Sequence, residues 1–215
     1  MIQTENISTI IFDLGGVLIN LDLVRCIQRF KELGVQNFED KLSNFGQKGF
    51  FLQFEKGGID IPEFCNEVRK LAAVPLTDQQ IIDAWCLFLV DIPDYKMELL
   101  LKLKQRYRLL LLSNTNPIHI EISTAREFER FGLKMEDVFD KCYFSYDMKM
   151  AKPDAEIFEA LLADAGAKPE ECLFLDDGQK NIEQATRLGI RSYLVDVNED
   201  LNKLVGSLQL TVDSQ

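Results

Sequence analysis

Carboxylates, a serine and a lysine each come at or just after the end of a short apolar run of the chain. Asp13 directly follows such a run, Ser113 ends another, Lys152 lies shortly after a third, and Asp176 and Asp177 end a fourth. These residue types can supply a nucleophile, a hydroxyl donor, a positive charge and oxygen ligands for a metal ion. Their order predicts one site assembled from four segments.

The first two positions could serve chemistry or local structure. A carboxylate at Asp13 could attack phosphorus and hold a metal ion, and the glycines that follow in Leu14-Gly15-Gly16 let the backbone turn sharply beside a ligand. The alternative is an aspartate that caps a turn. The hydroxyl of Ser113, with the backbone N–H groups after it, could bind a phosphoryl oxygen or could cap the next helix.

Lys152 and the pair Asp176 and Asp177 carry opposite charges that could stabilise each other. Lys152 precedes Pro153 at a predicted helix start, where a cation gains nothing from the helix dipole. It could neutralise neighbouring carboxylates and a phosphoryl group, although most lysines are solvated surface residues. The adjacent carboxylates of Asp176 and Asp177 raise each other's pKa unless a cation joins them, and such oxygen ligands suit Mg²⁺. A helix cap would explain only one of the two.

The elements that would position these residues alternate along the chain. Apolar runs predict buried strands at Thr9–Phe12, Leu109–Leu112, Cys142–Phe144, Leu173–Leu175 and Ser192–Val195. Helical patterns separate the later runs: one contains Ile157, Leu161 and Ala165 between Pro153 and Gly166, and another runs from about Gln179 to Leu188. The pattern predicts an α/β fold, a Rossmann-like parallel sheet whose ligands bind beyond the carboxyl ends of the strands.

Most of the segment 21–90 exceeds what a connection between two strands needs. Its periodic apolar residues predict an inserted bundle of short helices, which could close over the site as a cap; they are Val24, Ile27, Phe30, Phe64, Val68, Leu71, Ile81, Trp85 and Leu89. The division is then 1–20 and 91–215 for the core and 21–90 for the cap. The aromatic residues Phe45, Phe50, Phe51 and Phe54 could line a substrate pocket, but their near-helical spacing favours the interior of the cap.

Composition narrows the function classes. The 215 residues carry 24 Lys+Arg and 35 Asp+Glu, a net charge of −11, which disfavours nucleic acids and anionic membranes as partners. Five scattered cysteines and a single histidine argue against a zinc site and a disulfide framework, and for a reducing cytoplasmic location. No basic-then-apolar leader and no run of about 18 apolar residues is found, so we expect no membrane span.

Together the motifs resemble those of the haloacid dehalogenase superfamily. Phe-Asp-Leu-Gly-Gly-Val-Leu (12–18) is similar to its first motif, Leu-Leu-Ser-Asn (111–114) to its second, Lys152-Pro153 to its third and Leu-Asp-Asp-Gly-Gln-Lys-Asn (175–181) to its fourth. The resemblance spans about residues 8–200. Within the superfamily, the first two motifs resemble the subgroup of bacterial glucose-1-phosphate phosphatases.

The resemblance implies a role for each residue. Asp13 is the nucleophile of an aspartyl-phosphate mechanism, Ser113 and Asn114 position the phosphoryl group, and Lys152 holds its charge. Mg²⁺ is bound by Asp13, the carbonyl of Gly15, Asp177 and, directly or through water, Asp176. The implied substrate is a small phosphorylated metabolite.

The sequence departs from the family pattern at two positions. Gly15 stands where most phosphatases of the superfamily carry an aspartate that protonates the leaving group, a group worth about 10²–10⁴ in rate. Asn181 stands where an aspartate is common. His119 could reach the mouth of the site or lie on the surface, and Arg25 could meet an anionic substrate or lie on an exposed helix face.

Two other functions fit parts of the pattern. A 2-haloacid dehalogenase also lacks the second aspartate, but it uses no metal, whereas adjacent carboxylates at Asp176 and Asp177 beside Asp13 call for a divalent cation. A catalytically weakened binding or regulatory protein is the other alternative, which the retained nucleophile, lysine and metal carboxylates disfavour.

Overall fold

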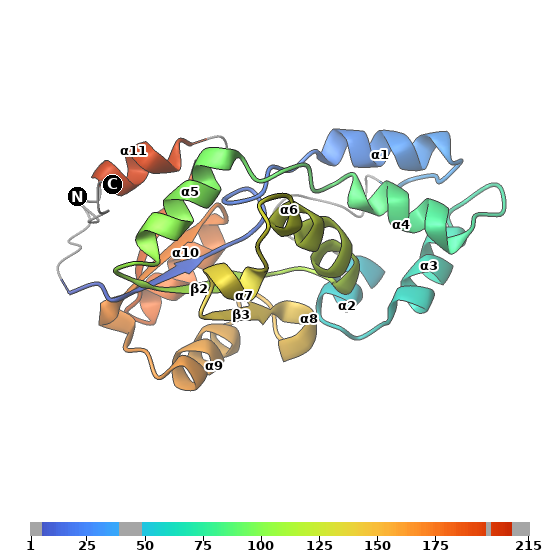
Figure 1. The fold of residues 1–215 in the computed structure, drawn as a ribbon. Helices are drawn as coiled ribbons and strands as arrows, with labels where there is room; N and C mark the ends of the chain where they lie inside the picture. The colour runs from blue at the N-terminus through green and yellow to red at the C-terminus, as the bar shows by residue number, and fades with distance from the viewer. Residues whose placement is uncertain (1–5, 39–48, 197–198, 208–215) are drawn as a thin grey trace.

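A five-stranded parallel sheet forms the centre of the computed structural model, which describes residues 6–38, 49–196 and 199–207 (Figure 1). The strand order is β3-β2-β1-β4-β5. The strands are β1 (Thr9–Phe12), β2 (Arg108–Ser113), β3 (Lys141–Phe144), β4 (Cys172–Asp176) and β5 (Arg191–Leu194). All five lie where the sequence predicts them, with bounds that differ by at most one residue, and the predicted fold class is confirmed.

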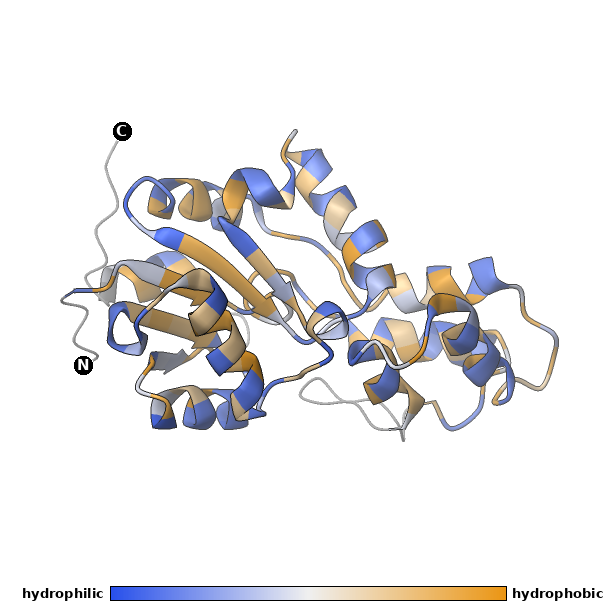
Figure 2. Cartoon of the chain, turned by 90° about the horizontal axis from the view of Figure 1, so that it is seen from below, coloured by the Kyte–Doolittle hydropathy of each residue, from blue (hydrophilic) through white to orange (hydrophobic). Residues whose placement is uncertain are grey.

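Both faces of the sheet are covered because its strands are apolar on both sides. Ile11 packs on one face with α9 (Ala155–Ala165) and α10 (Gln179–Arg187). Ile10 and Phe12 pack on the other face with α5 (Asp94–Leu103) and α11 (Leu201–Ser207). Hydrophobic residues are concentrated along the strands, while the surrounding helices carry both kinds of residue (Figure 2).

Shorter elements complete the core. They are the π-helix η2 (His119–Thr124), α6 (Ala125–Arg130), α7 (Met135–Val138), α8 (Ser145–Met148) and the 3₁₀ helix η3 (Pro169–Glu171). The long helix predicted between Pro153 and Gly166 is α9, and it ends at Gly166 with a left-handed φ of 59°. The helix predicted from Gln179 is α10, whose N-cap is Gly178, so neither Asp176 nor Asp177 caps it.

The inserted segment forms a helical cap, as predicted. It contains α1 (Leu23–Glu32), α2 (Phe50–Glu55), α3 (Ile61–Arg69) and α4 (Asp78–Cys86), which lie beyond the carboxyl ends of the strands (Figure 1). Phe51, Phe54 and Phe64 are fully buried there, and the Trp85 ring lies 5.4 Å from that of Phe51. The exact division of the chain at residues 21 and 90 stays a prediction.

The apolar residues predicted inside the cap are not all buried there. Val24 is 77% exposed, so its predicted place on the buried face of α1 is wrong, whereas Phe30 is fully buried as predicted and Ile27 is partly buried. Cys26 completes the buried face. Phe45 falls outside the described residues. Phe50, Phe51 and Phe54 pack within the cap and line no part of the main cavity, which confirms the interior placement.

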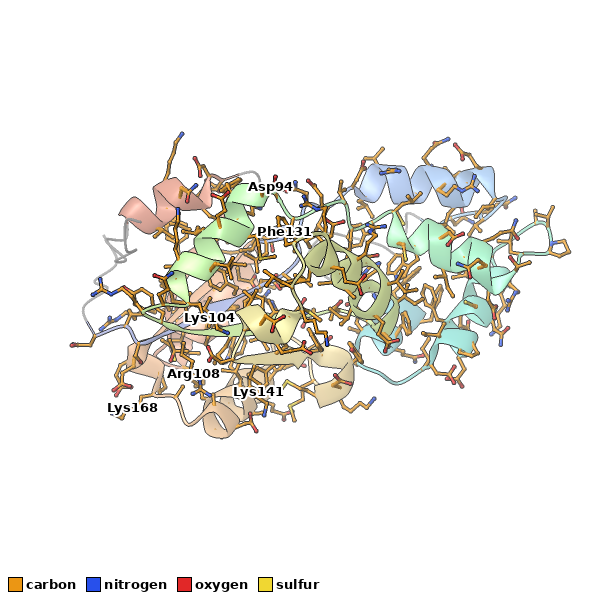
Figure 3. All side chains as sticks on the ribbon, viewed as in Figure 1. Asp94, Lys104, Arg108, Phe131, Lys141 and Lys168 are labelled. Carbon is orange, nitrogen blue, oxygen red and sulfur yellow. The ribbon has the colours of Figure 1, made fainter. Side chains whose placement is uncertain are left out.

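The surface gives few further clues. No helix among the described residues is both long and apolar enough to cross a bilayer. All five cysteines are free thiols. The basic residues labelled in Figure 3, Lys104, Arg108, Lys141 and Lys168, lie on the side of the core away from the cap, so none of them adds positive charge at the carboxyl ends of the strands. The predicted cytoplasmic location stays a prediction.

Candidate active site

The predicted residues meet in one cavity between the carboxyl ends of the strands and the cap. Its walls come from the end of β2, the loops after β1 and β4, other segments of the core, and the cap. The lining residues are Asp13, Leu14, Gly15, Leu21, Glu55, Phe88, Leu89, Ser113, Asn114, Thr115, His119, Lys152, Asp177, Gly178 and Asn181. Parallel strands bring their carboxyl ends to one edge of a sheet, which explains how residues 100 positions apart come together. The register places Phe12 opposite both Leu111 and Leu175, so Asp13 lies between the ends of β2 and β4.

Lys152 is the centre of the charge network and is not a surface residue. Its Nζ donates to the backbone carbonyl of Leu112 at 2.9 Å and to Oδ2 of Asp176 at 2.6 Å, and it lies 2.9 Å from Oδ1 of Asp13. Burial lowers the pKa of Lys152, but the charges of Asp13 and Asp176 outweigh burial and hold the pKa above its usual value. The ammonium therefore stays charged and links two of the carboxylates.

Asn114 fixes the backbone of Lys152. Its side-chain nitrogen donates to the Lys152 carbonyl and its side-chain oxygen accepts from the Lys152 N–H, both at 2.9 Å. The amide is thereby committed to positioning the lysine. Ser113 lies beside it with a hydroxyl that makes no hydrogen bond to any described residue, so this hydroxyl can serve a ligand.

Asp13 is buried in an environment that disfavours its ionised form. Burial raises its pKa to about 8, Lys152 opposes this increase, and the charges of Asp176 and Asp177 add to it. The N–H of Leu14 donates to Oδ1 at 2.7 Å. Ionisation of Asp13 near neutral pH would need more positive charge nearby than Lys152 supplies.

A divalent cation fits the donor set. Asp13, Asp176 and Asp177 each offer a carboxylate oxygen, and these oxygens lie within 4.8 Å of one another. Hard oxygen ligands of this kind match Mg²⁺. Gly16 makes room for them: a Cβ built there would lie 2.2 Å from Oδ2 of Asp177, so any side chain would displace this carboxylate.

The two adjacent aspartates differ in their contacts. Asp176 is fully buried, and its Oδ1 accepts from the Gly178 N–H at 2.7 Å and from the Asn181 side chain at 2.8 Å, while Lys152 takes Oδ2. Asp177 has no such donors among the described side chains and faces the cavity. Asp177 is therefore the better direct ligand. The contact from Asn181 also explains the departure at this position, because an aspartate could not donate to Asp176.

His119 is buried rather than exposed at the site mouth. Its ring stacks on Trp85 with centroids 4.7 Å apart, its Nε2 donates to the Trp85 carbonyl at 3.1 Å, and its Nδ1 accepts from Asn116 at 3.2 Å. Burial lowers its pKa to about 4. Arg25 is exposed on α1 and does not line the cavity.

Glu55 is a residue of this cavity that sequence reasoning missed. It ends α2 in the cap, only 9% of its surface is exposed, and its carboxyl group makes no hydrogen bond or ion pair with any described residue. A signal was available: Glu55 lies one helical turn after the buried Phe51, which places a carboxylate on the apolar face of a helix.

Comparison with known proteins settles the family. A model of the haloacid dehalogenase-like hydrolases matches residues 7–189. The chain belongs to this family. A curated relative, the D-ribitol-5-phosphate phosphatase of Bacteroides thetaiotaomicron, is 34% identical over 187 residues, which are 87% of this chain and 91% of the relative.

Solved structures of haloacid dehalogenase-like (HAD) hydrolases share the whole architecture. A HAD family enzyme from Bacteroides thetaiotaomicron, crystallised with magnesium and inorganic phosphate, is 48% identical with a TM-score of 0.87 and covers 92% of this chain and 98% of its own. A HAD-like hydrolase from Porphyromonas gingivalis is 40% identical with a TM-score of 0.88, at 95% and 98% coverage. The superfamily inferred from the motifs is confirmed.

Proposed function

We propose that the protein is a Mg²⁺-dependent phosphatase that cleaves a small phosphorylated metabolite through an aspartyl-phosphate on Asp13. The observation that carries this proposal is the buried contact between Lys152 and both Asp13 and Asp176 at the floor of a cavity that Asp177 also lines. The magnesium and phosphate bound to the similar Bacteroides enzyme support it.

Each residue has a task that its contacts allow. Asp13 attacks phosphorus, and water later hydrolyses the ester. Lys152 neutralises charge that builds up on the phosphoryl oxygens, the Ser113 hydroxyl donates to one of them, and Asn114 keeps Lys152 in place. Asp13, Asp177 and the Gly15 carbonyl would hold Mg²⁺, with Asp176 close behind; the cation would screen the charges of the nucleophile and the substrate.

The substrate class that we propose is the phosphate ester of a sugar alcohol or small sugar. The D-ribitol-5-phosphate phosphatase supports the first of these, while the resemblance of the first two motifs to glucose-1-phosphate phosphatases supports the second. The cavity offers Lys152 and Ser113 for the phosphate group of such an ester. Leu21, Phe88 and Leu89 form its apolar side.

The experiment that tests this function is a hydrolysis screen of purified protein with D-ribitol 5-phosphate, glucose 1-phosphate, glucose 6-phosphate and a phenyl phosphate. EDTA should abolish hydrolysis and added Mg²⁺ should restore it. We also expect no halide release from 2-chloropropionate. Halide release that needs no metal, with no phosphate released from any ester, would instead favour the dehalogenase alternative.

A further inference from the structure

We propose that Glu55 of the cap donates the proton to the leaving oxygen and later accepts one from the attacking water, the task for which Gly15 leaves no side chain. This proposal rests on the phosphatase function above. It extends the reaction to a residue of the cap, 42 positions from the nucleophile (55 − 13).

The other polar groups of the cavity are already used. The three N–H donors of Lys152 have three acceptors within 2.9 Å, in Leu112, Asp13 and Asp176. Both ring nitrogens of His119 are engaged, and its Nε2–H is held by the Trp85 carbonyl. Asp177 belongs to the metal-binding set. Among the described residues that line the cavity, Glu55 is the remaining carboxyl group.

The carboxyl group of Glu55 is positioned but unpartnered. It is about nine-tenths buried, lines the cavity with Asp13, and forms no hydrogen bond or ion pair with a described residue. Because no described residue occupies it, the carboxyl group is free to contact a ligand in the cavity. Asp13 and Glu55 come from opposite sides of the cavity, core and cap, so a substrate bound between them can contact both.

The backbone around Glu55 is fixed to the core by three contacts. The Ser145 hydroxyl donates to the Glu55 carbonyl at 2.6 Å, Lys149 Nζ donates to the Gly57 carbonyl at 2.9 Å, and Lys56 pairs with Asp154 at 3.0 Å. The end of α2 is therefore held against α8 and the start of α9. A donor held in this way needs little reorganisation during the reaction.

The environment also favours the protonated form of Glu55. Burial raises its pKa to about 8, the charge of Asp13 adds to this increase, and Lys152 opposes it. These are the titratable groups that face it. A carboxyl group that remains protonated near pH 7 can act as an acid, and after donating it can act as a base.

The two steps balance. As Asp13 forms its bond to phosphorus, the bond to the ester oxygen breaks and that oxygen takes the Glu55 proton, which releases a neutral alcohol. The Glu55 carboxylate then takes a proton from water while the water oxygen attacks phosphorus. Phosphate leaves, Asp13 is again a carboxylate and Glu55 is again an acid.

The test is a series of aryl phosphates of similar size whose phenols differ in acidity, with Mg²⁺ present and with the rate of phenol release measured in single turnovers. These substrates have no sugar hydroxyls, so a role of Glu55 in binding hydroxyls does not affect them. In the parent, the rate should depend only weakly on phenol acidity. Glu55→Gln should slow the least acidic phenols by about 10²–10³-fold and the most acidic by less than about fivefold.

Asp154→Asn is the matched control, since it removes the ion pair with Lys56 in the same cap–core contact and keeps Glu55. It should slow every phenol by the same factor. The proposal is overturned if Glu55→Gln also slows all phenols equally, or if only KM rises. It is equally overturned if the parent itself shows a steep dependence on acidity, a measurement that needs no variant. A parent that cleaves no phosphate ester refutes the phosphatase function, and the Glu55 role with it.

Discussion

The ionisable residues of the site carry more negative than positive formal charge. Asp13, Asp176 and Asp177 bring three negative charges and Lys152 brings one positive charge, so two remain. A divalent cation would neutralise them, and it would also lower the pKa of Asp13 into the range where the nucleophile is ionised. The oxygens of Asp176 accept from Lys152, from the Gly178 N–H and from Asn181, which stabilises its negative charge beside that of Asp177.

The first prediction concerns the nucleophile. Asp13→Asn should reduce turnover of a phenyl phosphate by at least about 10³-fold, because an amide of the same volume cannot attack phosphorus. The thermal unfolding midpoint should stay close to that of the parent, since Lys152 keeps its pairing with Asp176. Turnover comparable with the parent would exclude Asp13 as the nucleophile.

The second prediction concerns Asn181, which donates to Asp176. Asn181→Leu should weaken Mg²⁺ binding by about 10–100-fold, the usual cost of losing a hydrogen bond to a ligand set. The Mg²⁺ concentration for half-maximal activity measures this change. Asn202→Leu on α11, outside the cavity, is the control and should leave that concentration unaltered. Equal values for both variants would mean that Asn181 does not support the metal site.

The elements differ in how well the sequence predicts them. The strands were predictable because buried parallel strands are continuous apolar runs, and Asp13, Ser113 and Asp176 follow from their ends. The cap was predictable as helical but not in detail: Val24 is exposed because α1 turns Cys26 and Phe30 inward. Glu55 was missed because no strand end marks it; only the packing of α2 against the core brings it to the cavity.

The third prediction concerns the contact between α2 and α8. Gly57 has a φ of +60°, and a Cβ built there would lie 2.2 Å from the Tyr146 carbonyl oxygen. Gly57→Ala should therefore move the end of α2, which carries Glu55, and lower kcat/KM for a phenyl phosphate by about tenfold or more. The variant should also have a free energy of unfolding lower by about 1 kcal/mol, because alanine disfavours this backbone conformation.

Gly132→Ala is the matched control for this change. Gly132 has a similar φ of +69°, but a Cβ there would meet nothing within 4 Å. It should lose similar conformational stability and keep kcat/KM. If Gly132→Ala impairs kcat/KM as much as Gly57→Ala, the backbone strain and not the contact with α8 explains the effect.

On the scale of the whole molecule, the cap converts an open sheet edge into an enclosed site. Core residues bring the charges, and cap residues bring the apolar wall of Leu21, Phe88 and Leu89 together with Glu55. Enclosure strengthens the electrostatic interactions of the site, but it also buries acidic groups that would be more stable in water. Part of the folding free energy should therefore depend on the pH at which these groups ionise.

The last prediction concerns how the burial of Glu55 makes the free energy of unfolding depend on pH. Its pKa is about 8 in the folded protein against an ordinary value of 4.5, so between these two pH values the folded protein holds a proton that the unfolded chain has released. Raising the pH through this range therefore favours unfolding, and the parent should lose about 2–5 kcal/mol more than Glu55→Gln. His119, whose pKa is lowered to about 4, acts in the opposite direction but is present in both proteins, so it cancels in the difference. Denaturant unfolding in EDTA at a series of pH values from 4 to 9 gives the two curves, with Glu129→Gln on the exposed side of α6 expected to follow the parent. Parallel curves for the parent and Glu55→Gln would show that Glu55 ionises alike in both states, and that the cavity does not hold its proton.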